Sequence, residues 1–394
     1  MHVHLRFLAL LLAVAGVVGG VLAVTVWNTD ENKAAPDGGD TSIVTATGPT
    51  ALTGPSASTG PTAVPGETGT TTDYAQELPL PINGPMLGVN LTAYTRDGYG
   101  EPGVQKMMRT IADLGSTAVT LVPTWYMRRP DSNRIRPDKE KTPSDESLIK
   151  AIDWARESGL QVVLKPHVDV IDDTYRGEIQ PTDRTRWFRS YQRFTDHFAS
   201  LASSYQADMY VVGTELKTMS GEAEAWRQLV SETRDLYSGP VTYAANWDEV
   251  DQVQFWDDLD AIGVDAYYPL SGEGGQSPTL KGLTEAWQPV KDQLKAKSDQ
   301  WDRSVILTEI GYPSQVGATV KPFEVTSQPV DQNIQALAYQ AAFKALSGTG
   351  WLEGISWWSW RADPSPEENL ESDYTPTGKK AQSQLARGQY TFIG

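Results

Sequence analysis

The stretch Tyr210-Val-Val-Gly-Thr-Glu215-Leu216 is a short apolar run that ends on a glutamate. A second stretch, Val305-Ile-Leu-Thr-Glu309-Ile-Gly-Tyr312, repeats this arrangement in the last quarter of the chain. Apolar runs of about four to eight residues that are rich in β-branched side chains are typical of buried strands. Each glutamate is therefore expected to emerge at the carboxyl end of a buried strand.

Similar runs recur outward from these two stretches and alternate with longer amphipathic segments. The expected strands are Met86–Thr92, Thr117–Pro123, Gln161–His167, Met209–Thr214, Val241–Asn246, Ala261–Tyr267, Val305–Glu309 and Ile355–Trp360. The expected helices are Gly103–Leu114, Ser144–Ser158, Arg184–Tyr205, Glu222–Tyr237, Thr284–Ser298 and Asp331–Leu346. Eight strands that alternate with helices, without a glycine-rich nucleotide loop after the first strand, favour a closed (β/α)8 TIM barrel over an open sheet.

Local signals mark several of the expected helix ends. Ser144 and Asp183 precede amphipathic segments and are suited to N-cap positions. Gly115 and Gly159 stand where helices are expected to end, because glycine adopts the left-handed backbone conformation found there.

The chain before the barrel divides into two segments. Residues 1–27 contain Phe7–Trp27, an uncharged apolar run behind Arg6 that is long enough to cross a bilayer. We interpret it as a signal anchor, with cleavage as a signal peptide near Val21-Leu22-Ala23 as the alternative. Residues 28–81 are rich in Thr, Gly, Pro, Ser and Ala, and such segments bury too little apolar surface to offset their ordering entropy. We therefore expect a disordered linker that joins a membrane anchor to an extracytoplasmic catalytic domain over residues 82–390, or a secreted protein if the anchor is cleaved.

The charge balance restricts the partners of this chain. It has 33 Lys and Arg against 50 Asp and Glu, which gives a formal net charge of −17. Such a charge repels phosphate backbones and anionic lipid surfaces, so we expect no nucleic-acid partner, and membrane contact only through the N-terminal segment. The chain has no cysteine, which excludes disulfides, thiolate metal sites and cysteine nucleophiles. We expect a monomer.

The two glutamates suit one particular chemistry. Active sites of α/β barrels lie at the carboxyl ends of the strands, and Glu215 and Glu309 follow the fourth and seventh expected strands. Cleavage of a glycosidic bond needs one carboxylic acid to protonate the leaving oxygen and a second carboxylate on the other side of the sugar. A pair of carboxylates held in structural salt bridges is the alternative.

Aromatic side chains gather at the same strand ends. The chain has 13 Trp against 8 Phe, and indole faces can stack on sugar rings while their polar edges stay paired. The candidates for sugar contact are Trp125, Trp247, Tyr267, Tyr268, Trp358 and Trp360. Core packing is the alternative for any one of them.

Rival chemistries find less support in the sequence. The third expected strand ends Lys165-Pro-His167-Val-Asp169, and a His and Asp pair can ligate a metal. Only 4 histidines exist, and His2 and His4 precede the barrel, so we expect neither a metal nor a cofactor. We expect His167 to bind substrate hydroxyls, and a residue that only orients its neighbours in a polar rim is the alternative. No Gly-x-Ser-x-Gly motif follows a strand, which argues against a serine hydrolase.

These motifs resemble those of the clan A retaining glycoside hydrolases, and most of all glycoside hydrolase family 113, the β-mannanase family. The resemblance rests on Gly213-Thr-Glu215-Leu, Thr308-Glu309-Ile-Gly-Tyr312 and Tyr374-Thr-Pro-Thr-Gly-Lys379, and it extends from Gly88 to Leu385. It implies an enzyme that hydrolyses β-1,4-mannan or manno-oligosaccharides with retention of configuration. A non-catalytic carbohydrate-binding barrel and a hydrolase of another cell-envelope glycan are the alternatives.

The resemblance also implies residue roles. Glu215 would be the acid/base and Glu309 the nucleophile, with Tyr267 or Tyr268 holding an oxygen of the nucleophile. Trp358 or Trp360 would floor the subsite where cleavage occurs. Most families of the clan place Asn directly before the acid/base, whereas this chain has Thr214 there. Asn246 or His167 would then contact the sugar 2-hydroxyl.

Overall fold

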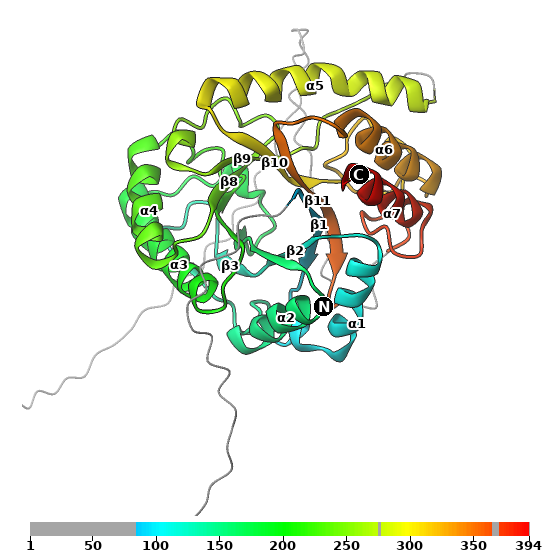
Figure 1. Cartoon of the computed structure of the whole chain (residues 1–394). Helices are drawn as coiled ribbons and strands as arrows, with labels where there is room; N and C mark the ends of the chain where they lie inside the picture. Colours follow the sequence, from blue (N-terminus) through cyan, green and yellow to red (C-terminus); the bar gives the residue numbers. More distant parts are fainter. Residues whose placement is uncertain (1–83, 275–276, 365–369, 394) are drawn as a thin grey trace, which may run out of the picture. The chain divides into compact units, whose positions relative to one another are not determined.

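The computed structural model describes residues 84–274, 277–364 and 370–393. Eight parallel strands close into a barrel in the spatial order β1-β11-β10-β9-β8-β7-β5-β2 (Figure 1). These strands are β1 (Met86–Thr92), β2 (Ala118–Val122), β5 (Gln161–Leu164), β7 (Met209–Thr214), β8 (Val241–Asn246), β9 (Ala261–Asp265), β10 (Ser304–Ile310) and β11 (Leu352–Arg361). The expectation of a closed barrel of eight parallel strands is confirmed.

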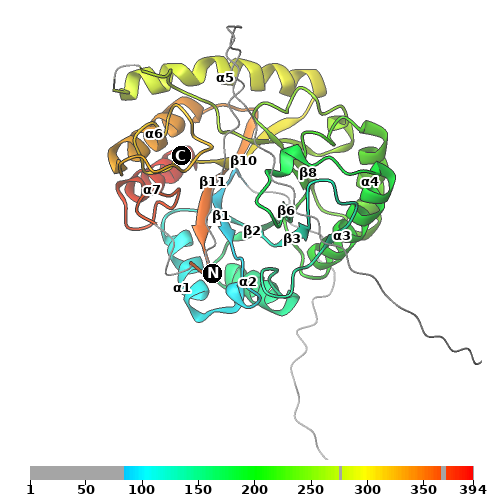
Figure 2. The same ribbon diagram turned by 180° about the vertical axis from the view of Figure 1, so that it is seen from behind.

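Helices form a ring outside the strands (Figures 1 and 2). They are α1 (Pro102–Asp113), α2 (Asp145–Glu157), α3 (Arg184–Ser204), α4 (Ala223–Leu236), α5 (Leu280–Trp301), α6 (Gln332–Leu346) and α7 (Lys380–Ile393), with short 3-10 turns η1 (Gly98–Gly100), η2 (Arg176–Glu178) and η3 (Trp256–Asp258). The expected caps are confirmed, because the side chains of Ser144 and Asp183 accept hydrogen bonds from backbone N–H groups of the first turns of α2 and α3. Gly115 and Gly159 have φ of +86° and +75°, as expected beyond helix ends.

The third expected strand is wrong in its extent. It was expected to run to His167, but β5 ends at Leu164 and a separate strand, β6 (His167–Val170), begins beyond Pro166. Proline lacks an N–H and cannot donate within a strand ladder. β6 instead joins β3 (Thr124–Met127) and β4 (Ile135–Arg136) in a small sheet of order β4-β3-β6 beyond the ends of β2 and β5.

Other boundaries also differ from the expected ones. The helix expected over Thr284–Ser298 is longer at both ends, since Thr279 caps α5 and the helix runs to Trp301. The strand expected to end at Tyr267 stops at Asp265. α7 was not expected at all.

The segments expected as an anchor (1–27) and a linker (28–81) lie outside the described residues. Among the described residues, no helix combines the length and apolar character needed to span a bilayer.

The apolar side chains form two layers around the strands. One cluster comprises Met86, Ala118, Val163, Met209, Val211, Ala244, Ala261 and Ile306, which come from seven of the eight barrel strands. A larger cluster lies between the strands and the helices, with fully buried Trp187, Trp226 and Trp287 among its members. Close packing on both faces fixes the strands, and so fixes the side chains that emerge from their ends.

Candidate active site

Glu309 lies in β10 with both carboxylate oxygens occupied. The Lys165 ammonium, directly after β5, is 2.5 Å from Glu309 Oε1, and the Tyr267 hydroxyl donates a 2.5 Å hydrogen bond to Oε2. Burial, reinforced by the Glu309 charge, raises the Tyr267 pKa well above its ordinary value, so its hydroxyl keeps the proton that it donates. A buried cation and a hydrogen-bond donor both favour the ionised form of the Glu309 carboxyl.

A second carboxylate shares the same lysine. Lys165 Nζ lies 3.1 Å from Asp265 Oδ1, and the Thr308 hydroxyl donates to that oxygen at 2.8 Å. Lys165 and Asp265 are fully buried. Burial, followed by the nearby Glu309 charge, raises the pKa of Asp265 well above its ordinary value. One ammonium thus lies between two carboxyl groups, those of Asp265 and Glu309.

His167 lines the same side of the site. Its Nε2 is 3.7 Å from Glu309 Oε1, and its ring stacks on Trp358 with centroids 5.9 Å apart and planes 11° apart. Burial lowers the His167 pKa well below its ordinary value, and the Arg176 and Lys165 charges lower it further. Neither ring nitrogen has a hydrogen-bond partner within the described part of the chain. A neutral, buried imidazole with free nitrogens is suited to bind a hydroxyl group.

Glu215 follows β7 in a left-handed backbone conformation, with φ of +53°. Its N–H donates to the Ala244 carbonyl at 2.8 Å, and the N–H of Leu216 donates to the Tyr243 hydroxyl at 2.9 Å. The Tyr243 hydroxyl in turn donates to the buried Glu249 carboxylate at 2.7 Å. A non-glycine residue at positive φ is uncommon and persists only where its surroundings fix it, as these bonds do.

An arginine neutralises Glu215 in part. Arg176, in η2, donates from Nη1 to Glu215 Oε2 at 3.0 Å and from Nη2 to Asp169 Oδ1 at 2.5 Å. Burial raises the pKa of Glu215 to about 7, Arg176 opposes that rise, and the Glu309 charge adds to it. Near neutral pH Glu215 is therefore able to carry a proton.

Asn246 lies on the Glu215 side of the site. Its Nδ2 donates to the Tyr175 hydroxyl at 2.9 Å, and its backbone N–H donates to Glu249 Oε2 at 3.0 Å. Burial raises the Tyr175 pKa, and the Glu215 charge raises it further. Asn246 is thus tied to both the loop around Tyr175 and the turn that holds Glu215.

The structure brings some of the predicted aromatic residues together and separates others. Tyr267 contacts Glu309 and Trp358 contacts His167, as described. Tyr268 points elsewhere, with its ring against Trp247 at 5.7 Å and Trp287 at 6.4 Å. Trp247 also stacks on the exposed Phe323, with centroids 6.4 Å apart.

The last two predicted aromatic residues pack in the core and against a helix. Trp360 is 2% exposed and belongs to the core between strands and helices. Trp125 packs against α3, with ring centroids 5.7 Å from Phe194 and 5.2 Å from His197.

Sequence reasoning overlooked four polar residues of the site. Lys165 and Asp265 carried a usable signal, because each ends a buried apolar strand. Arg176 and Tyr175 lie between β6 and α3 outside any periodic run, so no pattern marked them. Within the described ranges, no group of three or more His, Asp and Glu side chains is placed to hold a metal ion.

Comparisons with known proteins agree with this geometry. The model of Glycoside Hydrolase Family 113 matches residues 91–379. A GH113 β-1,4-mannanase is similar in structure, with 25% identity, a TM-score of 0.70, and coverage of 77% of this chain and 98% of that one. The GH113 β-mannanase of Alicyclobacillus acidocaldarius, in complex with ManMIm, has 27% identity, a TM-score of 0.71, and coverage of 78% and 98%.

A more distant structure shares the fold alone. It is the GH5_18 protein of Streptomyces cattleya in complex with GlcNAc, with 15% identity, a TM-score of 0.51, and coverage of 78% of this chain and 80% of that one. No curated protein matches the chain in sequence. Because the family model spans most of the barrel and both rim glutamates, the chain belongs to glycoside hydrolase family 113 and is an endo-β-mannanase-like glycoside hydrolase.

Proposed function

We propose that this protein hydrolyses β-1,4-linked mannan or manno-oligosaccharides by double displacement, with Glu215 as acid/base and Glu309 as nucleophile. The observation that carries the proposal is the contrast between the two carboxyls. Glu309 contacts an ammonium and a hydroxyl that favour its charged form, whereas burial raises the pKa of Glu215 to about 7. One charged and one protonated carboxyl are what the first step requires.

In that step Glu309 attacks the anomeric carbon while Glu215 gives its proton to the departing oxygen. The bond from the anomeric carbon to the leaving sugar breaks, and a glycosyl ester of Glu309 forms. Glu215, now charged, then takes a proton from a water molecule that attacks the same carbon and frees Glu309. Two inversions give net retention, and enzymes of this type hold their carboxyls about 5–5.5 Å apart.

Substrate recognition is assigned to the side chains around the pair. His167 offers two unbonded ring nitrogens beside Glu309, and the partly exposed Trp358 stacks against it. We assign sugar stacking to Trp358 and contact with the 2-hydroxyl to His167 or Asn246. The mannan specificity itself rests on the mannanases that this chain resembles.

The test is hydrolysis of β-mannan and manno-oligosaccharides by the full-length chain, with β-glucan and β-xylan in parallel. We expect mannan cleavage, with the β-anomer formed first when products are followed by NMR. Release of the α-anomer would overturn double displacement. Cleavage of another glycan with the same dependence on Glu215 and Glu309 would overturn only the substrate. Sugar binding without cleavage of any glycan would favour a carbohydrate-binding barrel.

We also propose that Phe7–Trp27 holds the enzyme at the outer face of the cell membrane, on the strength of its uncharged apolar length behind Arg6. Fractionation of cells that produce the full-length chain tests this. We expect activity in the membrane fraction, accessible to protease from outside the cell. Activity in the cytosol would contradict the proposal.

A further inference from the structure

A cavity lies behind the small β4-β3-β6 sheet, apart from the candidate active site. Side chains alternate across a strand, so neighbours in β3 face opposite ways. Tyr126 is paired with Asp169 of β6, and Asp169 binds the arginine that holds Glu215. Trp125 faces the other way and packs on α3, with its ring centroid 5.8 Å from Phe198. The cavity beside Trp125 is therefore separated by the sheet from the two carboxyls.

This arginine pocket has a volume of about 430 Å³. It is lined by Trp125, Arg134, Ile135, Arg136, Pro137, Ser190 and Arg193. Its two walls are joined, because the Ile135 N–H donates to the Ser190 hydroxyl at 2.9 Å and Ser190 is 1% exposed. The volume falls within the range of about 300–1,000 Å³ that is typical of small-ligand sites.

The charge of the pocket is unusual for this chain. The side chains of Arg134, Arg136 and Arg193 make no hydrogen bond or ion pair to any residue that the structure describes. Nearby carboxylates are already engaged: Asp131 pairs with Arg129 at 2.7 Å, and Asp138 accepts two backbone N–H groups at 2.9 and 3.0 Å. Three unpaired guanidinium groups therefore share one cavity in a protein of net charge −17.

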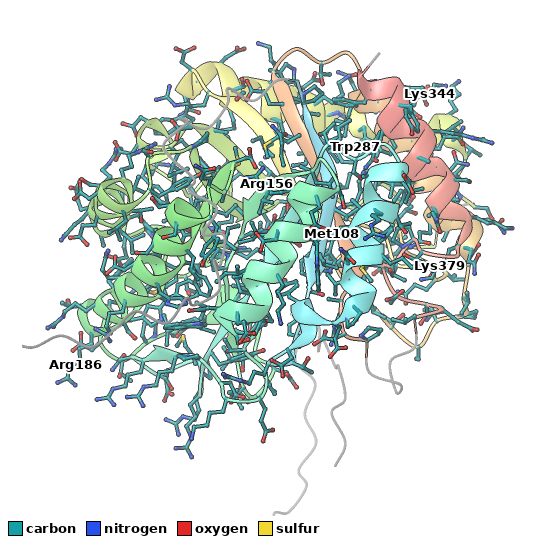
Figure 3. All side chains as sticks on the ribbon, turned by 60° about the horizontal axis from the view of Figure 1, so that its bottom comes forward. Met108, Arg156, Arg186, Trp287, Lys344 and Lys379 are labelled. Atoms are coloured by element: carbon teal, nitrogen blue, oxygen red, sulfur yellow. The ribbon has the colours of Figure 1, made fainter. Side chains whose placement is uncertain are left out.

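The surroundings reinforce this positive charge. Figure 3 shows nitrogen-tipped side chains gathered on the side of the molecule where Arg186 of α3 projects. Arg128 and Lys139 are also exposed along the segment between β3 and α2. An anion that enters the pocket is attracted by the whole patch, and its charge reduces the repulsion among the arginines.

We propose that the arginine pocket binds an acidic sugar unit, such as a uronic acid residue of an anionic polysaccharide. A sugar ring fits against the half-exposed indole of Trp125, and its carboxylate accepts paired N–H groups from the guanidinium forks. Nucleic acid suits the site less well. Its phosphates form a continuous row that the rest of this acidic surface repels. The site is independent of the mannan-cleaving function proposed for the two glutamates.

The experiment measures binding of trigalacturonate to the full-length chain by isothermal titration calorimetry, in the presence and absence of mannotriose. We expect trigalacturonate to bind in both conditions. The double substitution Arg134→Gln/Arg136→Gln and the single Arg193→Gln are each expected to weaken its binding about tenfold or more, since each removes charge-assisted hydrogen bonds. Mannan hydrolysis is expected to stay unchanged in these variants.

Arg189→Gln is the matched control. Arg189 is exposed, lies one turn before Arg193 on α3, and does not line the pocket. We expect it to change trigalacturonate affinity less than twofold. An equal loss in this control would overturn the pocket in favour of diffuse charge attraction. Displacement of trigalacturonate by mannotriose would place it in the active site.

Three further outcomes would also overturn the proposal. One is the absence of trigalacturonate binding at low ionic strength. The others are tighter binding, through the same arginines, of single-stranded DNA or of phosphatidylglycerol vesicles, which would assign the pocket to a different class of partner. Circular dichroism of each variant excludes misfolding as the cause of a loss.

Discussion

Glu309 and Glu215 lie at the same end of one barrel, yet different kinds of structure set their charge. The partners of Glu309 are Lys165, which directly follows barrel strand β5, and Tyr267, which lies two residues beyond β9. The cation beside Glu215 is Arg176, which comes from the short turn η2 beyond the barrel. The barrel itself thus fixes the proposed nucleophile, whereas a loop tunes the proposed acid.

Removal of each carboxyl in turn gives the largest expected effect. Glu309→Ala loses the nucleophile and should lower kcat/KM for manno-oligosaccharides by roughly 10⁴–10⁶. Glu215→Ala loses the acid/base and should lower it by roughly 10²–10⁴. Azide distinguishes them. In Glu309→Ala, azide should attack the anomeric carbon in place of the missing carboxylate and give an α-mannosyl azide. In Glu215→Ala, azide should attack the glycosyl ester of Glu309 and give a β-mannosyl azide. NMR of the products reads the configuration, and the reverse assignment of azides would exchange the two roles.

Lys165 tests whether the barrel holds the nucleophile. Lys165→Met leaves Glu309 and Asp265 buried side by side without their cation. Breaking a buried ion pair from one side typically costs about 3–5 kcal/mol, so we expect a loss of that order in the free energy of unfolding and a large fall in kcat. Urea unfolding and steady-state kinetics measure the two effects.

A double substitution provides the control. Lys165→Met/Asp265→Asn removes one positive and one negative group together, so it should recover part of the lost stability. Glu309 still lacks its cation, and kcat should remain low. Recovery of full activity in the double variant would show that Lys165 serves only to neutralise Asp265.

The same contrast explains how far the sequence predicts this protein. Strand runs that end on polar residues predict the barrel, Glu215 and Glu309, because burial on both faces imposes a pattern on each strand. The same rule would have identified Lys165 and Asp265. This rule does not identify Arg176, because the position of Arg176 depends on how the segment after β6 folds back over the site.

Aromatic residues show a second limit of the sequence. Trp125 and Trp358 both lie near the ends of expected strands, but of the two only Trp358 contacts His167, the neighbour of Glu309. The difference comes from Pro123 and Pro166, which end β2 and β5 and pass the chain into a second small sheet. Side-chain direction in that sheet depends on its pairing, which no local pattern specifies.

The buried setting of Glu215 should also appear in the stability of the fold. Its pKa is about 7 in the folded chain against about 4.3 unfolded, so its contribution to stability is complete below pH 4 and is lost as pH rises toward 7 and above. The loss amounts to at most about 4 kcal/mol at pH 8. Glu215→Gln should therefore increase the free energy of unfolding, relative to the unsubstituted chain, by more at pH 8 than at pH 4. Urea unfolding of both proteins at both pH values measures this difference. The exposed Glu224→Gln should show no such difference.

Substitution of Arg176 should give the smallest effect on activity, and it tests whether the loop that carries Arg176 sets the pKa of Glu215. Arg176→Gln removes the charge that opposes the rise in the Glu215 pKa, so this pKa should move above 7 by about one unit or more. The first step needs protonated Glu215, and the alkaline limb of the kcat/KM profile should move to higher pH by the same amount.

Arg184→Gln is the control for this shift, because Arg184 forms an exposed ion pair with Glu222 and should leave the limb in place. A purely structural role for Arg176 would lower activity at every pH without moving the limb. Movement of the limb to lower pH would contradict the assigned sign and exclude Glu215 as the group that must be protonated. A shift to higher pH in Arg176→Gln alone would show that a loop side chain sets the working pH of an acid whose position the barrel fixes.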